Sequence, residues 1–378
     1  MSSAPDAAGS RGRGRGGRLR RIAVRLAVSG AVFLLCLLVA EGVLRLCGYG
    51  NFQGNAYSES DPELGWVLRP NVSIDVVRPD HRYKVSTNSL GLRGGELRAP
   101  SSRRILLIGD SYAFGEGVDD DQTIASHLQS MLDERYGSSF EVVNGGVYGY
   151  GALQALGSMR RLWDSVQPAV VIYIHCGNDF ADDLRHARGS YNKVRSAIPG
   201  REFLRSHSAL YNVVKPGVLA VLSKLGIYNA NIDFESKGEG GLVSDLGEQR
   251  QQGEALTVGA IADAAKLCGE RGAEFAVTTV GFSLDGGRFS LSSDAKSVED
   301  ACRASAKPIR FLDPTRGFPT TVKEPWYGQH SVGHFSPEGC GFFARSLLDG
   351  LSDAGWLSSA PAGSAPHGKP AGAKSSGD

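Results

Sequence analysis

Five short apolar runs recur along the middle of the chain, and longer stretches with apolar residues at helical spacing separate them. Continuous apolar runs of this length are typical of strands that are buried on both faces. Strands that alternate with helices require right-handed crossovers, so the pattern predicts an α/β fold, a three-layer α/β/α sandwich around a five-stranded parallel sheet. We assign it to a domain of residues 101–355. The predicted strands are Arg104 to Ile108, Phe140 to Val143, Ala169 to Ile174, Glu274 to Val280 and Pro308 to Leu312.

A different apolar pattern lies near the start, where Leu26 to Ala40 carries no charge and Gly42-Val43-Leu44 continues it past Glu41. A bilayer-crossing helix needs about 20 residues, so the segment 26–46 is just long enough to be a transmembrane helix. It also fits the apolar part of a signal peptide. No Ala-x-Ala cleavage site follows cleanly, and an arginine two residues before Cys47 makes a poor lipoprotein site. We therefore favour an uncleaved anchor.

The charge distribution predicts the orientation of this anchor. Residues 1–25 hold seven arginines and one acidic residue, whereas the rest of the chain holds 34 basic and 39 acidic residues. Basic residues stay on the cytoplasmic side, so residues 1–25 are predicted to be cytoplasmic and the folded domain periplasmic or extracellular. The alternation of arginine and glycine also resembles an RNA-binding tract, but beside an apolar run its simpler interpretation is topogenic. No nucleic-acid partner is predicted for the folded part.

Three further segments differ from the alternating core. Residues 57–100 form an extended, turn-rich lead-in between anchor and domain. Residues 180–252 are long for a crossover and predict an insertion, either extra helices that cover the sheet or a lid or membrane-facing rim that selects substrate. Residues 358–378 are rich in Ala, Gly, Pro and Ser, cannot bury a core, and are predicted to be disordered.

The candidate chemistry lies at the end of the first predicted strand, where Ser111 follows the apolar run. A serine hydroxyl is a weak nucleophile until a base accepts its proton. His334 is the candidate base, on a loop just before a helical stretch from Pro337 to about Leu351. The turn Gly109-Asp110-Ser111-Tyr112-Ala113 lacks the glycines of the Gly-x-Ser-x-Gly elbow, which disfavours the common α/β-hydrolase fold.

Four blocks of sequence surround these candidate residues: Gly109 to Val118, Asn144 to Gly149, Gly177-Asn178-Asp179 and His334 to Gly339. In this order they resemble the motif blocks of the SGNH, or GDSL, hydrolases. The resemblance implies a flavodoxin-like core. It also implies Ser111 as nucleophile, His334 as general base, and oxyanion donors from the Ser111 backbone, the Gly149 backbone and the Asn178 side chain.

The sequence departs from this family at one position. An aspartate usually precedes the histidine by three residues, or by two in some branches, and here these positions hold Ser331 and Val332. Three explanations stay open: a backbone carbonyl or the Ser331 hydroxyl orients His334, a distant acid such as Asp313 does so, or activity has been lost. In a serine protease, loss of the orienting acid lowers kcat by about 10⁴-fold.

Cysteines and histidines add little to the prediction. Cys176, Cys268, Cys302 and Cys340 allow two disulfides, Cys176 with Cys340 and Cys268 with Cys302, or four buried free thiols. The histidines show no paired spacing with carboxylates and the exported cysteines no Cys-x-x-Cys, so no metal is predicted. No cofactor is predicted either.

Together these features predict a membrane-tethered serine esterase. Its substrate would be a carboxylic ester, an acyl or acetyl group on a lipid, glycan or small molecule, cleaved through an acyl-Ser111 intermediate. Two alternatives stay open: an O-acyltransferase that uses the same serine on a glycan, and a catalytically degenerate protein that binds polysaccharide or organises an assembly.

Overall fold

The computed structural model describes most of the chain outside its two ends and the insertion. The described residues are 13–47, 57–77, 81–98, 102–189, 243–285, 288–318 and 333–357, with separate positions between 203 and 221. The predicted tail of residues 358–378 lies outside them.

A five-stranded parallel sheet forms the centre of the domain, as the sequence pattern predicts. Its strand order is β11-β8-β7-β5-β6. From β5 the chain first adds β6 on one side. It then adds β7, β8 and β11 in turn on the other side, which is the doubly wound arrangement of flavodoxin-like folds. The strands are β5 (Arg103–Gly109), β6 (Phe140–Asn144), β7 (Val170–His175), β8 (Glu274–Thr279) and β11 (Arg310–Phe311).

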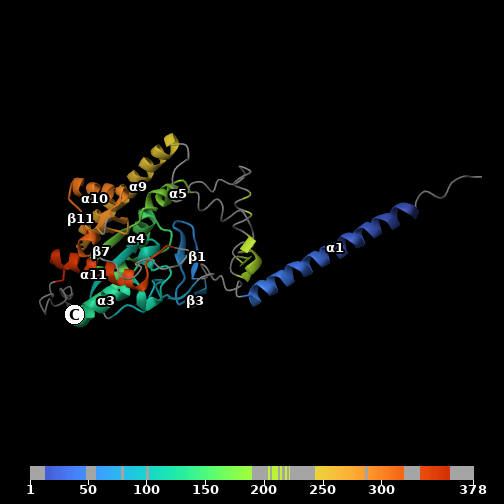
Figure 1. Ribbon diagram of the computed structural model, residues 1–378, viewed down its shortest axis with the longest axis horizontal. Helices are drawn as coiled ribbons and strands as arrows, with labels where there is room; N and C mark the ends of the chain where they lie inside the picture. The colour runs from blue at the N-terminus through green and yellow to red at the C-terminus, as the bar shows by residue number, and fades with distance from the viewer. Residues whose placement is uncertain are drawn as a thin grey trace, which may run out of the picture.

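Helices cover both faces of this sheet (Figure 1). The side chains of β5 show why, because alternate residues of a strand point to opposite faces. Ile105 and Leu107 enter the core beneath α3 and α11, whereas Leu106 and Ile108 enter the core beneath α4, α9 and α10. The helices are α3 (Ile124–Tyr136), α11 (Pro337–Asp353), α4 (Ala152–Val166), α9 (Val243–Glu270) and α10 (Ser293–Ala304).

Two hairpins occupy most of the predicted lead-in. β1 (Ser58–Asp61) pairs with β2 (Gly65–Leu68), and β3 (Ser73–Val77) pairs with β4 (Arg82–Ser86). They share an apolar core with Phe114, just after the candidate nucleophile. A further hairpin, β9 (Phe282–Asp285) with β10 (Arg288–Leu291), was not predicted.

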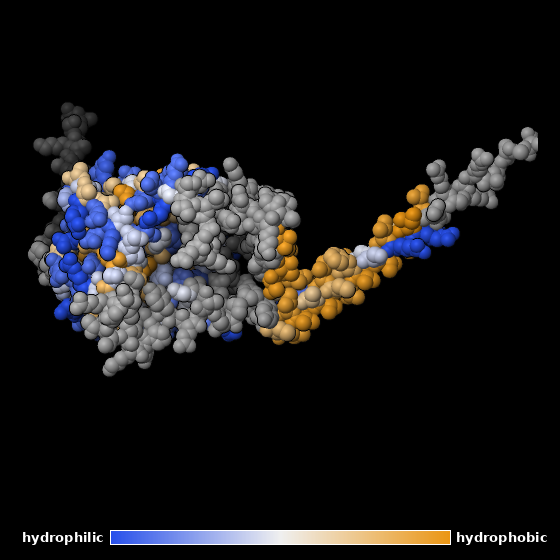
Figure 2. Space-filling model, turned by 45° about the horizontal axis from the view of Figure 1, so that its top comes forward, coloured by the Kyte–Doolittle hydropathy of each residue, from blue (hydrophilic) through white to orange (hydrophobic). Residues whose placement is uncertain are grey.

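The N-terminal helix α1 (Arg13–Leu46) extends away from the domain (Figure 1). Its part from Leu19 to Leu46 is 28 residues long and contains an 18-residue window of mean hydropathy 2.5, none of which is buried. By length and composition it is able to cross a membrane. The helix begins 13 residues before the predicted anchor 26–46, and its basic residues occupy the hydrophilic end seen in Figure 2.

None of the six cysteines forms a disulfide. The two pairings considered from sequence are therefore absent, and the alternative of free thiols holds. Cys268 and Cys302 are buried in the core beneath α4 and α9, and Cys340 is buried in the opposite core. Cys176 is only partly buried.

Candidate active site

The backbone places Ser111 at a sharp turn between β5 and the short helix α2 (Ser111–Phe114). Gly109 ends the strand with φ +148°, and a Cβ there would lie 2.6 Å from the Ile174 carbonyl oxygen, so only glycine fits. The Asp110 carboxylate then caps α2 by accepting the Tyr112 backbone N–H at 2.9 Å. The turn holds the serine at the carboxyl edge of the sheet, where open α/β folds bind ligands.

His334 reaches this serine from the other end of the chain. Its Nε2 lies 2.7 Å from the Ser111 Oγ, although 223 positions separate the two residues. The neighbouring Phe335 is buried against the core and holds the loop down. Ser336 follows as the N-cap of α11, accepting the Gly339 N–H at 3.1 Å. The structure thus brings together the two residues predicted as nucleophile and base.

Tyr112 supports the imidazole from one side. Its ring centroid lies 4.7 Å from that of His334, and its hydroxyl donates to the Gly333 carbonyl oxygen at 3.1 Å. Its ring also meets Phe335 edge to face at 4.9 Å. This role of Tyr112 leaves no signal in the sequence, because no spacing links it to a histidine more than 220 positions away.

The predicted oxyanion residues follow three adjacent strands, since Asn178 follows β7, Ser111 follows β5 and Gly149 follows β6. Gly149 has φ +70°, in the left-handed region that favours glycine. Within the described part of the chain, the backbone N–H groups of Ser111 and Gly149 donate no hydrogen bond. The Asn178 Nδ2 donates one of its two hydrogens to Asp182 Oδ2 at 2.8 Å.

The loop after β6 packs directly on the nucleophile turn. Gly145 donates its N–H to the Leu107 carbonyl at 2.8 Å, and Val147 donates to the Gly109 carbonyl at 3.0 Å. A Cβ at Gly146 would collide with the backbone of Ala113. The glycines of the second block therefore allow two backbone segments to touch beside Ser111.

Two buried acids lie behind the nucleophile. The Asp110 carboxylate lies 3.2 Å from the Ser111 Oγ, and burial raises the pKa of Asp110 to about 6. Burial, reinforced by the charge of Asp110, raises the pKa of Asp179 well above its usual value. Tyr173 donates its hydroxyl to Asp179, and the Cys176 backbone N–H donates to the same oxygen. These contacts join the end of β7 to the segment that follows it.

The distant acid considered for His334 has other partners. The Asp313 carboxylate accepts the backbone N–H and the hydroxyl of Thr315, at 2.9 and 2.7 Å, and lies 3.6 Å from the Arg316 guanidinium. It caps the short helix η4 (Pro314–Gly317) instead of contacting the imidazole. Ser331 and Val332 lie outside the described residues.

Comparison with known proteins gives similarities of structure only. No family model and no curated protein match the chain. Among solved structures, the esterase EstA from Pseudoalteromonas sp. is 12% identical, with 68% of this chain and 99% of that chain covered and a TM-score of 0.39. A GDSL-like lipase from Bacteroides thetaiotaomicron is 12% identical, with 68% and 92% covered and a TM-score of 0.35. A catalytic mutant of an acetylxylan esterase from Geobacillus stearothermophilus is 12% identical, with 68% and 96% covered and a TM-score of 0.36.

The fold is read from the strand order, and the family resemblance from the four motif blocks. Those blocks resemble the GDSL hydrolases. Other similar structures are described as a GDSL-like lipase and as a lipolytic protein of the G-D-S-L family.

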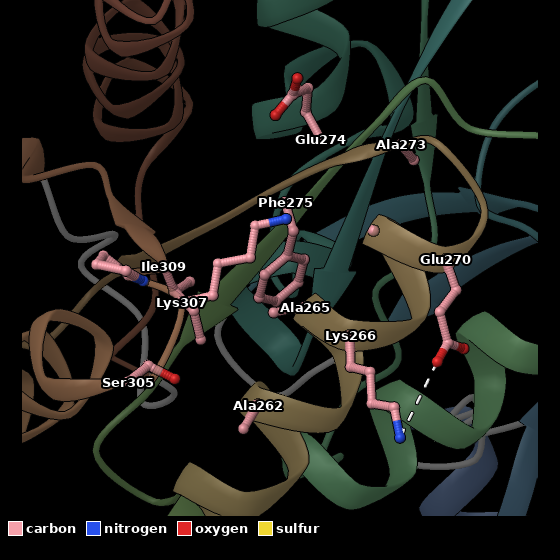
Figure 3. A pocket seen from close by; sticks show the side chains of 12 residues that line it. Ala262, Ala265, Lys266, Glu270, Ala273, Glu274, Phe275, Ser305, Lys307 and Ile309 are labelled. Carbon is pink, nitrogen blue, oxygen red and sulfur yellow. Dashed lines mark ion pairs between the residues drawn. The ribbon is translucent and has the colours of Figure 1, made fainter.

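A cavity of about 510 Å³ lies at the opposite edge of the sheet and does not belong to this site (Figure 3). It is lined by the end of α9 and by the amino end of β8, where Lys266 and Glu270 form an ion pair of 4.0 Å. Ser111 follows the carboxyl end of β5, whereas the cavity lies at the amino end of β8. The length of the strands therefore separates the cavity from Ser111.

Proposed function

We propose that the chain is a serine esterase that cleaves a carboxylic ester through an acyl-Ser111 intermediate. The observation that carries the proposal is the distance of 2.7 Å between Ser111 Oγ and His334 Nε2, at the carboxyl edge of the sheet. A base within hydrogen-bond reach is what a serine hydroxyl needs to become a nucleophile.

In this mechanism His334 accepts the Ser111 proton at Nε2 while Oγ attacks the ester carbonyl carbon. The protonated imidazole then donates that proton to the leaving alcohol, and the acyl-enzyme forms. A water molecule then gives a proton to the same Nε2 and attacks the acyl carbon. The bond between that carbon and the Ser111 Oγ breaks, the imidazolium returns the proton to Oγ, and the acid leaves. Tyr112 packs on the imidazole through both steps and keeps its plane toward Ser111.

The oxyanion would be bound by the backbone N–H groups of Ser111 and Gly149 and by the Asn178 side chain. The first two have no other acceptor among the described residues, so each can donate to the substrate oxygen. The contact to Asp182 fixes the Asn178 amide and leaves its second hydrogen for the same purpose. Loss of one such donor typically costs about 10²–10³-fold in turnover.

The N-terminal helix would tether this domain to a membrane, as an uncleaved anchor with the domain outside the cytoplasm. The support comes from the end of α1, where the Glu41 carboxylate accepts the backbone N–H groups of Ala209 and Leu210, at 3.0 and 2.9 Å, and the Ser208 hydroxyl at 3.0 Å. A cleaved signal segment would leave these three donors of the insertion without their acceptor. Exposed apolar side chains of the insertion, Phe203 and Val214 among them, lie near this junction in the chain.

A fluorophosphonate probe tests the nucleophile. The full chain in detergent should be labelled, and Ser111→Ala should abolish labelling, because the probe bonds only to an activated serine hydroxyl. The matched control is Ser130→Ala on the exposed side of α3, which should be labelled at the parental rate. Labelling that survives Ser111→Ala would place the nucleophile elsewhere.

The base is tested separately with a short-chain nitrophenyl ester. His334→Ala should lower kcat by about 10²–10⁴-fold, the range that general acid–base catalysis contributes. Its thermal unfolding midpoint should stay close to that of the parent, because Phe335 and Ser336 anchor the loop independently. Unchanged turnover in this variant would contradict the proposed role.

A further inference from the structure

The hairpin of β1 and β2 is fastened to the domain beside the candidate site. Arg161 on α4 holds the hairpin turn through Asp61 at 2.7 Å and Glu63 at 2.6 Å. Gln154, also on α4, donates its side-chain amide to the Leu64 carbonyl oxygen at 2.6 Å. The hairpin thus has a fixed position relative to the loop that connects β6 to α4.

Trp66 on β2 is the hairpin residue that meets this loop. Its indole N–H donates to the Tyr148 carbonyl oxygen at 3.1 Å, and its ring lies 6.0 Å from that of Tyr148 and 5.5 Å from that of Tyr150. In return, the Tyr150 hydroxyl donates to the Trp66 carbonyl oxygen. A Cβ at Gly149 would lie 3.3 Å from the indole ring, so the loop passes directly over it.

One peptide unit connects these contacts to catalysis. The Tyr148 carbonyl and the Gly149 N–H belong to the same planar trans peptide, in which the two groups point in opposite directions. A hydrogen bond that fixes the carbonyl therefore also fixes the direction of the N–H. Gly149 by itself would not hold this plane, because glycine is the residue with the widest choice of backbone angles.

We infer that Trp66 is a positioning residue that aims the Gly149 N–H at the oxyanion. This inference rests on the proposed function, since it assigns a role in the same site. The lead-in is then a part of the catalytic apparatus. The Trp66 indole N–H binds the carbonyl of a peptide unit, and the N–H of the same unit stabilises the transition state. Electrostatic stabilisation of this kind depends on donors that are oriented before the reaction begins.

The test compares Trp66→Phe with Trp163→Phe in the full chain. Both indoles are buried, with 5% and 6% of their surface exposed, but Trp163 lies on α4 in the core beneath α9 and contacts Arg271. Trp66→Phe keeps an aromatic ring and removes the N–H donor. We expect kcat to fall by about 10-fold with KM within about 2-fold, less than the 10²–10³-fold of an absent donor. Trp163→Phe should leave kcat unchanged.

Amide hydrogen exchange of the peptide that covers residues 144–151 provides a readout that needs no activity. It should be faster in Trp66→Phe and unchanged in Trp163→Phe. If the exchange is the same in both variants, or if kcat falls equally in both, the positioning role is wrong. If the parent is neither labelled by the fluorophosphonate nor active while exchange still responds to Trp66→Phe, the proposed function fails but the hold on the peptide stands.

Discussion

Asp183 shows at the residue scale how a buried carboxyl group organises this fold. Its carboxylate, fully buried on α5 (Asp179–Ala187), accepts the Leu153 N–H at 2.8 Å, the Ala152 N–H at 3.2 Å and the Thr257 hydroxyl at 2.5 Å. Asp183 therefore caps the amino end of α4 from another helix. This role normally belongs to the side chain of the residue just before the helix. Gly151 permits this, because a Cβ there would collide with the carboxylate.

This residue predicts a pH dependence of stability. Burial raises the pKa of Asp183 to about 7, with the charge of Asp182 adding to the effect, although the three donors oppose it. The folded protein then holds a proton that the unfolded chain releases near its ordinary pKa of about 4, so the stabilisation is complete below pH 4 and is lost as the pH rises to about 7.

Asp183→Asn should remove this contribution. The amide oxygen still accepts a backbone N–H, but the side chain no longer titrates, so the thermal midpoint should fall less steeply between pH 4 and pH 7 than in the parent. Thermal unfolding followed by circular dichroism at each pH measures the slope. Glu270→Gln, an exposed site on α9, is the control and should keep the parental slope. Parallel slopes in Asp183→Asn and the parent would contradict the assignment.

At the scale of elements, the lead-in holds the nucleophile turn through Arg93. The buried guanidinium donates to the carbonyl oxygens of Phe114, Lys84 and Val118, at 2.9, 2.8 and 2.7 Å, and pairs with Asp120 at 3.0 Å. It thereby binds the end of α2, which begins with Ser111, to β4 and to the loop before α3. Arginine suits this place because its planar fork presents five donors in fixed directions.

Arg93→Lys should therefore lose stability and nucleophile reactivity together. An ammonium has three donors and leaves buried carbonyl groups without partners, each at a cost of about 1–3 kcal/mol. We expect a loss of about 2–4 kcal/mol in the free energy of unfolding by urea, and slower fluorophosphonate labelling of Ser111. The control, Arg303→Lys on α10, changes an arginine with 70% of its side chain exposed, where ion pairs contribute little. If Arg93→Lys is as stable as the parent but Ser111 is labelled slowly, the predicted loss of stability is wrong and Arg93 only positions the nucleophile turn.

The sequence predicts the sheet better than it predicts these contacts. All five parallel strands occur where the apolar runs place them, because burial on both faces leaves a pattern within the run itself. Ser111 and His334 were identified by motif blocks, and the structure brings them within 2.7 Å. Trp66 contacts Tyr148, 82 positions away, and Arg93 contacts Phe114, 21 positions away, and no local periodicity records such contacts.

For the molecule as a whole, the insertion meets α1 at Glu41. Figure 2 shows an apolar surface over most of this helix. A charged side chain in an apolar membrane helix is costly unless it is paired, at about 2.5–3.5 kcal/mol at the helix centre on insertion scales and less toward the helix ends. Glu41 is paired with Arg45 at 2.7 Å and accepts the backbone N–H groups of Ala209 and Leu210. The contacts of Glu41 with Arg45 and with the insertion therefore explain why an acid is tolerated near the end of this helix.

Glu41→Leu in the full chain, reconstituted in lipid nanodiscs, tests that junction. Without the carboxylate, the Ala209 and Leu210 amides lose their acceptor, so their hydrogen exchange should become faster by about 10-fold or more, while the exchange of β5 and β7 stays at the parental rate. Glu270→Gln serves again as the control, since it alters an acid far from α1 in the chain and should leave both regions unchanged. Equal exchange of residues 207–211 in Glu41→Leu and the parent would mean that α1 and the insertion do not meet in the membrane-bound protein. The anchor would then lose its structural support, and a signal peptide would become the better interpretation of the same apolar segment.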